Sequence, residues 1–309
     1  MKKHFREWSV AGVLVLLLSG LAVGAPSFFQ PQPLLSLLAS SAPLLVVTCG
    51  MGLVIISRQI DISVGSQFGV CSVCAGLLAA AKWPLVLVLG ASLGVGLVLG
   101  VLNGLLVAGL RLPSIVVTLA AMVTWREALR WQRQGEFVNL PDQLQWMGLA
   151  QVPGQLALVV TAFGLLVLLA WAARHLAAGR FVYAVGSDSE SARLAGIHPR
   201  FTTFGVFALL GLLTGFAAVL NLVQSPQVDP KSGSGLELRA IAAAVVGGIS
   251  IAGGRGSLWG AFLGMLLLAC ISPALVHLHV EAYWERAIQG FIILMAVVAE
   301  GVQSRKENR

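Results

Sequence analysis

Long apolar stretches recur along almost the whole chain, and this feature restricts the fold more than any other. Of the 309 residues, 57% are hydrophobic and only 11% are charged, a composition that soluble globular domains do not have. A helix needs about 20 apolar residues to cross the hydrocarbon core of a bilayer. The sequence therefore predicts an all-α polytopic membrane protein, a single domain over 1–309 with about ten transmembrane helices in one bundle. The predicted spans are 8–24, 34–56, 63–81, 84–110, 114–131, 155–173, 201–223, 236–252, 257–277 and 286–302.

The distribution of basic residues indicates how this bundle faces the membrane. With a cytoplasmic N-terminus, ten spans return the C-terminus to the same side, and 13 of the 20 Lys and Arg residues fall on that side. Cytoplasmic loops carry such an excess, so the net charge of +7 indicates orientation rather than nucleic-acid binding. Ala22–Ala25 also resembles a signal-peptidase site. We favour an uncleaved first span because it preserves this charge balance.

The longest polar stretch between two apolar blocks is Gly186–Pro199, and its residues predict a short helix. Ser187, followed three residues later by Glu190, has the pattern of a capping box that starts a helix. Gly196 can end the helix in the left-handed conformation, and Pro199 prevents it from resuming. The orientation above places this helix in the cytoplasm. Two interpretations remain open: a docking element for a partner, or a tight loop that only joins two spans.

Small residues inside the spans predict close helix packing. Glycines spaced by about four residues let helices approach closely in lipid, and the chain has 35 glycines. This spacing occurs at Gly90, Gly94, Gly96, Gly100 and Gly104, and again at Gly260 and Gly264. The cysteines all lie in apolar stretches, so the C-x-x-C spacing of Cys71 and Cys74 favours small-residue packing over redox chemistry.

Several polar residues are candidates for a pathway through the bundle. Asp61 and Ser63 can cap the helix that follows them, and Gly65 allows close backbone approach there. Gly248–Gly253 is a weak echo of the same break, as in transporters whose two halves each contain an interrupted helix. Asn103 lies within a span, where an amide requires a neighbouring helix or a polar path.

Charged residues end the fifth predicted span. Arg126 and Arg130 share one helix face, and Glu127 lies three residues before Arg130. Each such charge would cost about 2.5–3.5 kcal/mol facing lipid at the midplane. They therefore lie at the outer interface or line the outer mouth of a polar pathway, and both options remain open. Four further polar residues are expected on this side, where they could receive a soluble partner: Gln224, Asp229, Lys231 and Glu237.

Motifs that the sequence lacks also narrow its function. No G-x-x-x-x-G-K-[ST] phosphate loop occurs, so the chain is not expected to hydrolyse nucleotide itself. No H-E-x-x-H and no grouping with metal-ligand spacing occurs either, so no catalytic residue and no metal site are predicted. Two alternatives remain: an ion-coupled secondary transporter of a small polar solute that uses Asp61, and a membrane enzyme acting on lipid-linked sugars.

Taken together, these motifs resemble the permease subunits of bacterial ABC importers of the ribose, arabinose and autoinducer-2 type. The resemblance covers about residues 34–302. Ile60–Ser66 resembles the family's I-D-L-S-V-G-S block, and Asn103–Gly104 with Leu112–Leu119 resembles its N-G and P-x-F-I-V-T-L motifs. Gly179–Ile197 and Gly233–Gly254 match two further segments, although Arg239 stands where the family usually has Asp. Trp125–Trp131 looks most like the rhamnose-type branch.

The resemblance implies a permease that carries a monosaccharide across the inner membrane unmodified: a pentose, a deoxyhexose such as rhamnose, or an autoinducer-2-like sugar. It implies ATPase subunits that use the ATP, a periplasmic sugar-binding protein and a second permease chain, identical or different, with no cofactor on this chain. In a cytoplasmic coupling loop over 179–200, the residues expected to couple to the ATPase are Ser187, Glu190, Arg193, Leu194 and Gly196. The residues expected along the translocation path are Asp61, Ser63, Asn103, Arg126, Glu127, Arg130, Gln224 and Glu237.

Overall fold

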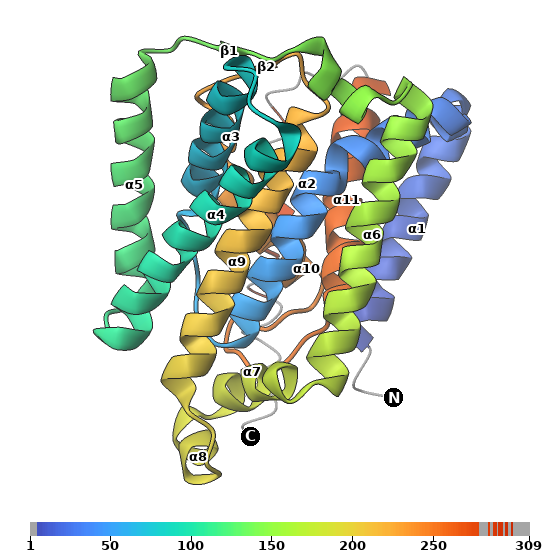
Figure 1. Ribbon diagram of the computed structural model, residues 1–309. Helices are drawn as coiled ribbons and strands as arrows, with labels where there is room; N and C mark the ends of the chain where they lie inside the picture. The colour runs from blue at the N-terminus through green and yellow to red at the C-terminus, as the bar shows by residue number, and fades with distance from the viewer. Residues whose placement is uncertain are drawn as a thin grey trace.

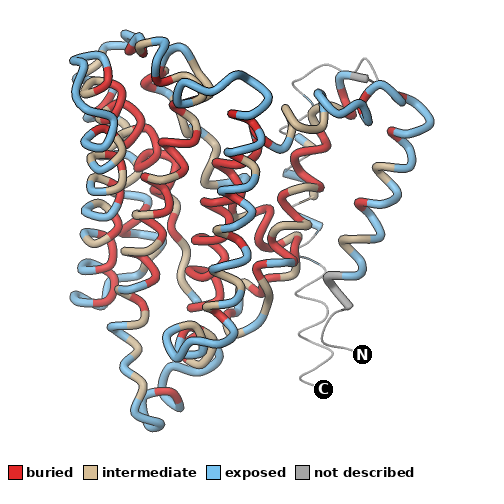
Figure 2. Tube along the Cα trace, turned by 45° about the vertical axis from the view of Figure 1, so that its right-hand side comes forward, coloured by how far each residue is buried: buried red, intermediate tan, exposed pale blue. Residues whose placement is uncertain are grey.

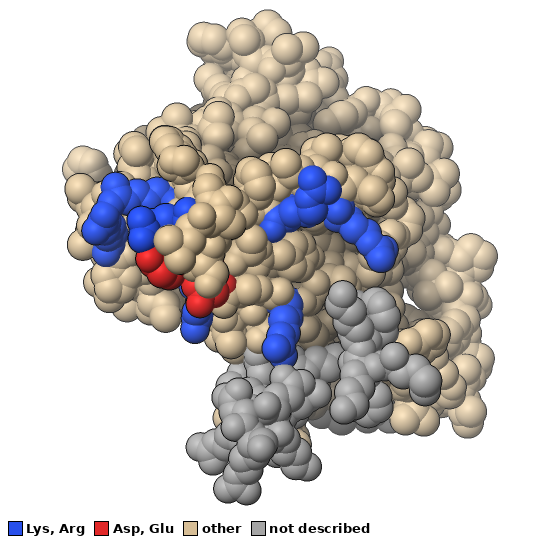
Figure 3. All heavy atoms as spheres, turned by 90° about the horizontal axis from the view of Figure 1, so that it is seen from below, with Lys and Arg blue, Asp and Glu red and all other residues tan. Residues whose placement is uncertain are grey.

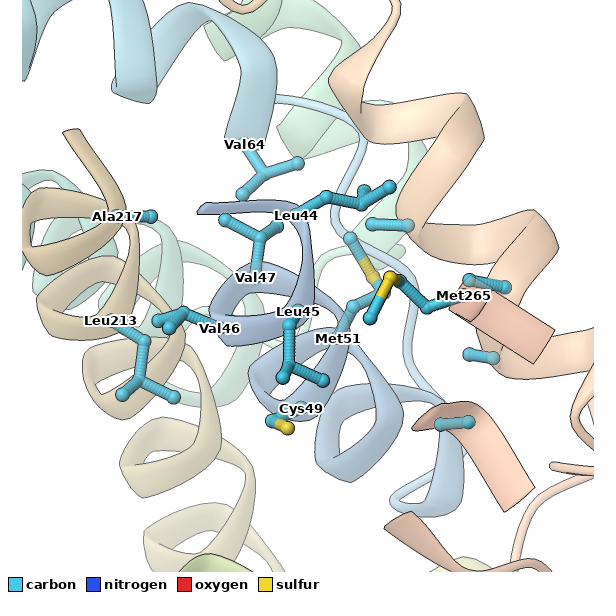
Figure 4. Close-up of a cluster of buried hydrophobic side chains, with 14 of the residues drawn as sticks. Leu44, Leu45, Val46, Val47, Cys49, Met51, Val64, Leu213, Ala217 and Met265 are labelled. Carbon is cyan, nitrogen blue, oxygen red and sulfur yellow. The ribbon is translucent and has the colours of Figure 1, made fainter. Parts of the chain in front are cut away.

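Helix α2 (Pro31–Ile56) lies at the centre of the fold in the computed structural model (Figure 1). The structure describes residues 5–277 and the positions 284, 287, 288, 290–292, 294, 295 and 298. In the most apolar part of α2, 94% of the residues are buried. Figure 4 shows why: side chains such as Leu44, Val46 and Met51 face neighbouring helices on several sides. They contact Leu213 of α9 and Met265 of α11 within one continuous apolar core.

The remaining helices surround α2 and are joined by short connections. The long ones are α1 (Phe5–Gly24), α4 (Leu85–Gly104), α5 (Ser114–Arg133), α6 (Gln151–His175), α9 (Pro199–Leu222) and α11 (Leu258–His277). The shorter ones are α3 (Val64–Ala80), α7 (Ala177–Ser187), α8 (Ser189–Leu194) and α10 (Leu236–Val246). Single turns of other helix types are η2 (Pro26–Phe29), η3 (Leu105–Gly109) and η4 (Asp142–Gly148). One two-residue ladder pairs β1 (Val138–Asn139) with β2 (Gln227–Val228) in antiparallel register.

The all-α prediction is confirmed, since helices dominate the described residues and the sheet is minimal. Five helices there are long and apolar enough to cross a membrane, namely α2, α4 with η3, α6, α9 and α11. Nine of the ten predicted spans coincide with a helix, and the span 286–302 falls largely outside the described residues. The span 236–252 was predicted too long, because Gly247 and Gly248 end α10 at Val246.

The predicted glycine packing is confirmed where α4 crosses α9. A Cβ on Gly100 would lie 2.9 Å from the Cα of Gly211, and one on Gly96 would lie 2.9 Å from the nitrogen of Gly215. The hydroxyl of Ser92 donates to the Gly215 carbonyl at 2.8 Å. Gly264 of α11 similarly lies against α10. These contacts give the close approach that stabilises helix pairs in lipid, whereas the outer sides of the helices are exposed (Figure 2).

The bundle has two distinct ends. The α8 end carries α7, α8 and the start of α1, and the strand end carries β1 and β2 (Figure 1). Viewed from below, basic side chains spread across the α8 end, and acidic atoms gather in one place (Figure 3). The predicted orientation, which places this end in the cytoplasm, stays a prediction.

Candidate coupling helix and polar pathway

Helix α8 begins one residue later than the sequence predicted. Its N-cap is Asp188, whose Oδ1 accepts hydrogen bonds from the backbone nitrogens of Glu190 at 2.9 Å and Ser191 at 2.8 Å. Ser187 is the last residue of α7. The predicted capping box of Ser187 and Glu190 is therefore wrong. The physical reason is that α7 extends to Ser187, which leaves the adjacent aspartate, an equally good capping residue, at the helix start.

The end of α8 follows the prediction. Gly196 has a φ of +82°, and its nitrogen donates to the Arg193 carbonyl at 3.0 Å. The nitrogen of Ile197 donates to the Ala192 carbonyl at 3.0 Å. This pair of bonds is a Schellman motif, which needs a left-handed residue and so favours glycine. Pro199 then occupies the first turn of α9, where its fixed φ is compatible with a helix.

The charged residues of α8 bind one another. Glu190 accepts hydrogen bonds from the Nε and Nη2 of Arg193 at 3.1 and 2.5 Å. This contact lowers the pKa of the Glu190 carboxyl and raises that of the Arg193 guanidinium. The backbone hydrogen bond from Ser191 lowers the pKa of Asp188, and nearby Arg58 adds to the effect. All are exposed, so solvent screens them, and they act chiefly by keeping α8 in one conformation.

Two large apolar side chains project from this helix and the start of α9. Leu194 is 76% exposed and Phe201 is 75% exposed, whereas Ala192 on the other face of α8 is buried. Leu194 was predicted from the sequence, whereas Phe201 was not. An aromatic residue two positions after a proline at a helix start was the available signal. A capped helix with apolar side chains directed into water can bind a partner.

Three predicted pathway residues, Asp61, Ser63 and Asn103, form a buried polar cage together with Gln67. The Oδ1 of Asp61 accepts from the backbone nitrogen and the hydroxyl of Ser63 at 2.8 and 2.6 Å. Its Oδ2 accepts from the amides of Gln67 and Asn103 at 3.2 and 3.1 Å. Both amides also donate to the Ser63 hydroxyl oxygen, at 2.9 and 2.8 Å.

The cage therefore holds the start of α3 and the segment before it against α4. Asp61 and Ser63 precede α3, Gln67 lies in its first turn, and Asn103 comes from α4. Ser63 occupies the N-cap position of α3 but does not cap it through its side chain, so that part of the prediction is wrong. The requirement that Asn103 bind another helix is confirmed. Gln67 was missed, and its spacing of four residues from Ser63 on one helix face was the signal.

Helix α5 is attached to the same segment by a stripe of polar contacts. The Ser114 hydroxyl accepts from the Ile60 nitrogen at 3.3 Å, and the Thr118 hydroxyl accepts from the Ile62 nitrogen at 3.1 Å. One turn further along α5, the Met122 carbonyl accepts from the Ser66 hydroxyl at 2.8 Å. Further along α5, Leu129 is buried in an apolar cluster with residues of α3 and the strand end. The segment before α3 therefore holds the first half of α5.

The second group of predicted pathway residues lies at the strand end of the bundle, in a region that we call the mouth. Arg126 of α5 donates to the Ser232 carbonyl at 3.1 Å, and Arg130 pairs with Glu127 at 2.8 Å as predicted. A pocket of about 450 Å³ is lined by Glu127, Arg130, Trp131, Gln134, Gly135, Pro230 and Lys231. A neighbouring pocket of about 280 Å³ is lined by Met122, Val123, Arg126, Glu127, Ser234, Gly235 and Glu237.

The two groups meet at the first turn of α3. A Cβ on Gly65 would overlap the carboxylate of Glu237 and the Gly233 carbonyl, which confirms that this glycine permits close backbone approach. Gln224 joins neither group, since its amide donates to the Leu220 carbonyl of its own helix at 2.8 Å. Among the described residues no three His, Cys, Asp or Glu side chains group as metal ligands.

Comparison with known proteins gives one consistent result. A family model described as "Branched-chain amino acid transport system / permease component" matches residues 34–297. The autoinducer 2 import system permease protein LsrC of Enterobacter sp. (strain 638) is 35% identical over 297 residues, covering 96% of this chain and 87% of the relative. The protein of the same name from Klebsiella pneumoniae is 36% identical over 297 residues, covering 96% and 86%. The one from Escherichia coli (strain K12 / DH10B) is 36% identical over 287 residues, covering 89% and 82%. No solved structure matches the chain.

Proposed function

This chain belongs to the family of permease components of branched-chain amino acid transport systems, and we propose that it is the membrane-spanning subunit of an ATP-driven importer. Members of this family are membrane transport proteins and not enzymes. The observation that carries the proposal is the capped α8 helix with its exposed Leu194 and Phe201. The chain has no phosphate loop of its own, and we propose that the energy enters through a partner. The partner we propose is a cytoplasmic ATPase subunit that binds α8.

The substrate we propose is a small sugar-like molecule. The family description names branched-chain amino acids, whereas the relatives above, which cover nearly the whole chain, are named for autoinducer 2 import. We follow the relatives because the mouth offers an exposed Trp131 and charged side chains of both signs, which suit a ligand with apolar faces and hydroxyl groups. Its pocket volume of about 450 Å³ falls in the usual range for small ligands, about 300–1,000 Å³. The rhamnose-type branch stays a prediction.

The arrangement in the membrane follows from this assignment. The α8 end faces the cytoplasm together with the chain termini, and the strand end faces the periplasm, where a sugar-binding protein delivers the substrate. The protein lies in the bacterial inner membrane and works with a second permease chain. The basic residues at the α8 end support this orientation. We propose that the path runs from the mouth past Gly65 toward the cage, because Gly65 contacts Glu237 of the mouth and follows the buried Asp61 and Ser63 of the cage.

The alternative of an ion-coupled transporter has less support. A carboxylate has about four lone-pair sites, and protein donors occupy four positions around Asp61. A coupling cation would have to displace at least one of these donors. The cage therefore fits a structural clamp better than an ion-binding site.

Reconstituted vesicles test the proposed function. Uptake of autoinducer 2 by this chain with its ATPase and binding protein should require ATP and should survive an uncoupler of ion gradients. Replacing Leu194 and Phe201 with Asp should abolish co-purification of the ATPase, because burying either charge at the interface carries a large desolvation cost. The matched control is Leu149→Asp, an exposed leucine (49%) near the strand end, which should keep the ATPase bound. Uptake that proceeds without ATPase would refute the proposal.

A further inference from the structure

At the α8 end, three segments that are distant in the sequence meet through backbone atoms alone. Gly186, in the last turn of α7, is buried and lies directly against the Ile56 carbonyl and the Gly254 nitrogen. A Cβ at position 186 would overlap both. The Gly254 nitrogen in turn donates to the Ile56 carbonyl at 2.8 Å. We call the contact of Ile56, Gly186, Gly253 and Gly254 the glycine joint.

Further contacts hold the same three segments in register. A Cβ on Gly253 would lie 2.7 Å from the Gly186 carbonyl and 3.0 Å from the Cβ of Arg58. Gly253 and Gly254 have φ values of +84° and +68°, a region that glycine enters at little cost. The Tyr183 hydroxyl of α7 donates to the Gly256 carbonyl at 3.1 Å. In Figure 1, α7 lies across the end of the bundle.

Each of the three segments leads to a different part of the molecule. Gly186 is two residues before the N-cap of α8, Ile56 is the last residue of the central helix α2, and Gly253 and Gly254 lie in the connection between α10 and α11. Packed backbone atoms have no rotamers through which to absorb a displacement, and packed interfaces deform little. A shift of α8 therefore reaches α2, α10 and α11 without an intervening flexible side chain.

We propose that the glycine joint is the positioning element that transmits the movement of α8 to the core of the bundle, with Gly186 as its central residue. This proposal rests on the proposed function, because it assumes that an ATPase displaces α8. It also explains why backbone contacts hold the C-terminal end of α7, the helix that joins α6 to α8. A joint that serves only to hold α7 in place would affect how much protein folds, but not the ratio of substrate imported to ATP hydrolysed.

The test measures that ratio in vesicles that contain the complete importer. Gly186→Ala should retain the bound ATPase and its hydrolysis, while substrate imported per ATP should fall at least tenfold. The matched control is Gly205→Ala in α9, where a Cβ meets nothing within 4 Å among the described residues, and its ratio should stay within twofold of wild type. Tyr183→Phe removes only a hydroxyl and should lower the ratio two- to fivefold at unchanged abundance.

The outcomes separate the two proposals. A wild-type ratio in Gly186→Ala overturns the joint, and so does a wild-type ratio in Tyr183→Phe if Gly186→Ala does not fold. Failure of the wild-type chain to bind an ATPase at all would instead refute the proposed function. Loss of import and hydrolysis in equal proportion in both variants would assign the joint a purely structural role and also overturn the proposal.

Discussion

Replacing Asn103 with leucine tests the polar cage most directly. Its amide donates to the Oδ2 of Asp61 at 3.1 Å and to the Ser63 hydroxyl oxygen at 2.8 Å. Leucine has a similar volume but neither donor. A hydrogen bond between membrane helices contributes about 0.6 kcal/mol on average and up to about 1.7 kcal/mol. Gln67 still donates to both acceptors, so neither is left unpaired. From the two lost bonds we expect Asn103→Leu to lower the free energy of unfolding by about 1–3 kcal/mol.

The assay is reversible unfolding by SDS in mixed micelles, followed by the fluorescence of the eight tryptophans. Ser92→Ala provides a control on the same helix, because it removes one hydrogen bond, at 2.8 Å to the Gly215 carbonyl. It should cost about 0.6 kcal/mol. Combining Asn103→Leu with Gln67→Leu should be non-additive, since both amides donate to the same two acceptors. The reasoning is refuted if Asn103→Leu costs no more than Ser92→Ala.

Two further predictions concern packing and pH. Gly100→Leu should destabilise the fold by about 3 kcal/mol or more in the same SDS titration, because the larger side chain overpacks against α9. The control is Gly94→Leu, which should have little effect, since a Cβ on Gly94 meets nothing within 4 Å among the described residues. The pKa of Asp188 lies below its usual value, so its capping of α8 should be complete above about pH 4 and lost only as the pH falls through that lowered pKa. Hydrogen exchange at the Ser191 amide, corrected for intrinsic rate, should therefore show constant protection from pH 5 to 8 and loss in stronger acid.

Packing between helices was partly predictable because its signal is local. Gly96 and Gly100 recur at a spacing of four on one helix, and lipid leaves close van der Waals contact as the main source of stability between helices. The partner of each glycine was not predictable, because α9 follows more than 90 residues later. The prediction of the cage was limited in the same way. Asp61, Ser63 and Asn103 were each recognised as polar residues in apolar surroundings. Their contact was not predicted, because 40 residues separate Ser63 from Asn103.

Some helix ends were predicted without a glycine to mark them, since the predicted spans 34–56 and 63–81 end at or next to the last residues of α2 and α3. Gly196 ends α8 as expected, yet Arg58, Lys82 and Arg111 also adopt left-handed φ values of 68°, 60° and 58°. At Arg58 the backbone forms the same two Schellman bonds, to the carbonyls of Ile55 and Val54. A basic side chain there interacts favourably with the helix dipole, and tertiary contacts offset the backbone cost. The sequence holds no local signal for the left-handed residue at such ends.

The segment from Ser57 to Ser63 links the two regions on which the proposed mechanism depends. It begins at the glycine joint, where Ile56 contacts Gly186, and it ends in the cage at Ser63. Along its length, backbone nitrogens of Ile60 and Ile62 bind α5, the helix that carries the charged residues of the mouth. Seven residues span at most about 25 Å, and most of these contacts are hydrogen bonds that fix the chain direction. A displacement of α2 at the joint must therefore move the cage and the first half of α5 together or break these bonds. This connects α8, which we propose binds the ATPase, to the mouth at the opposite end of the bundle.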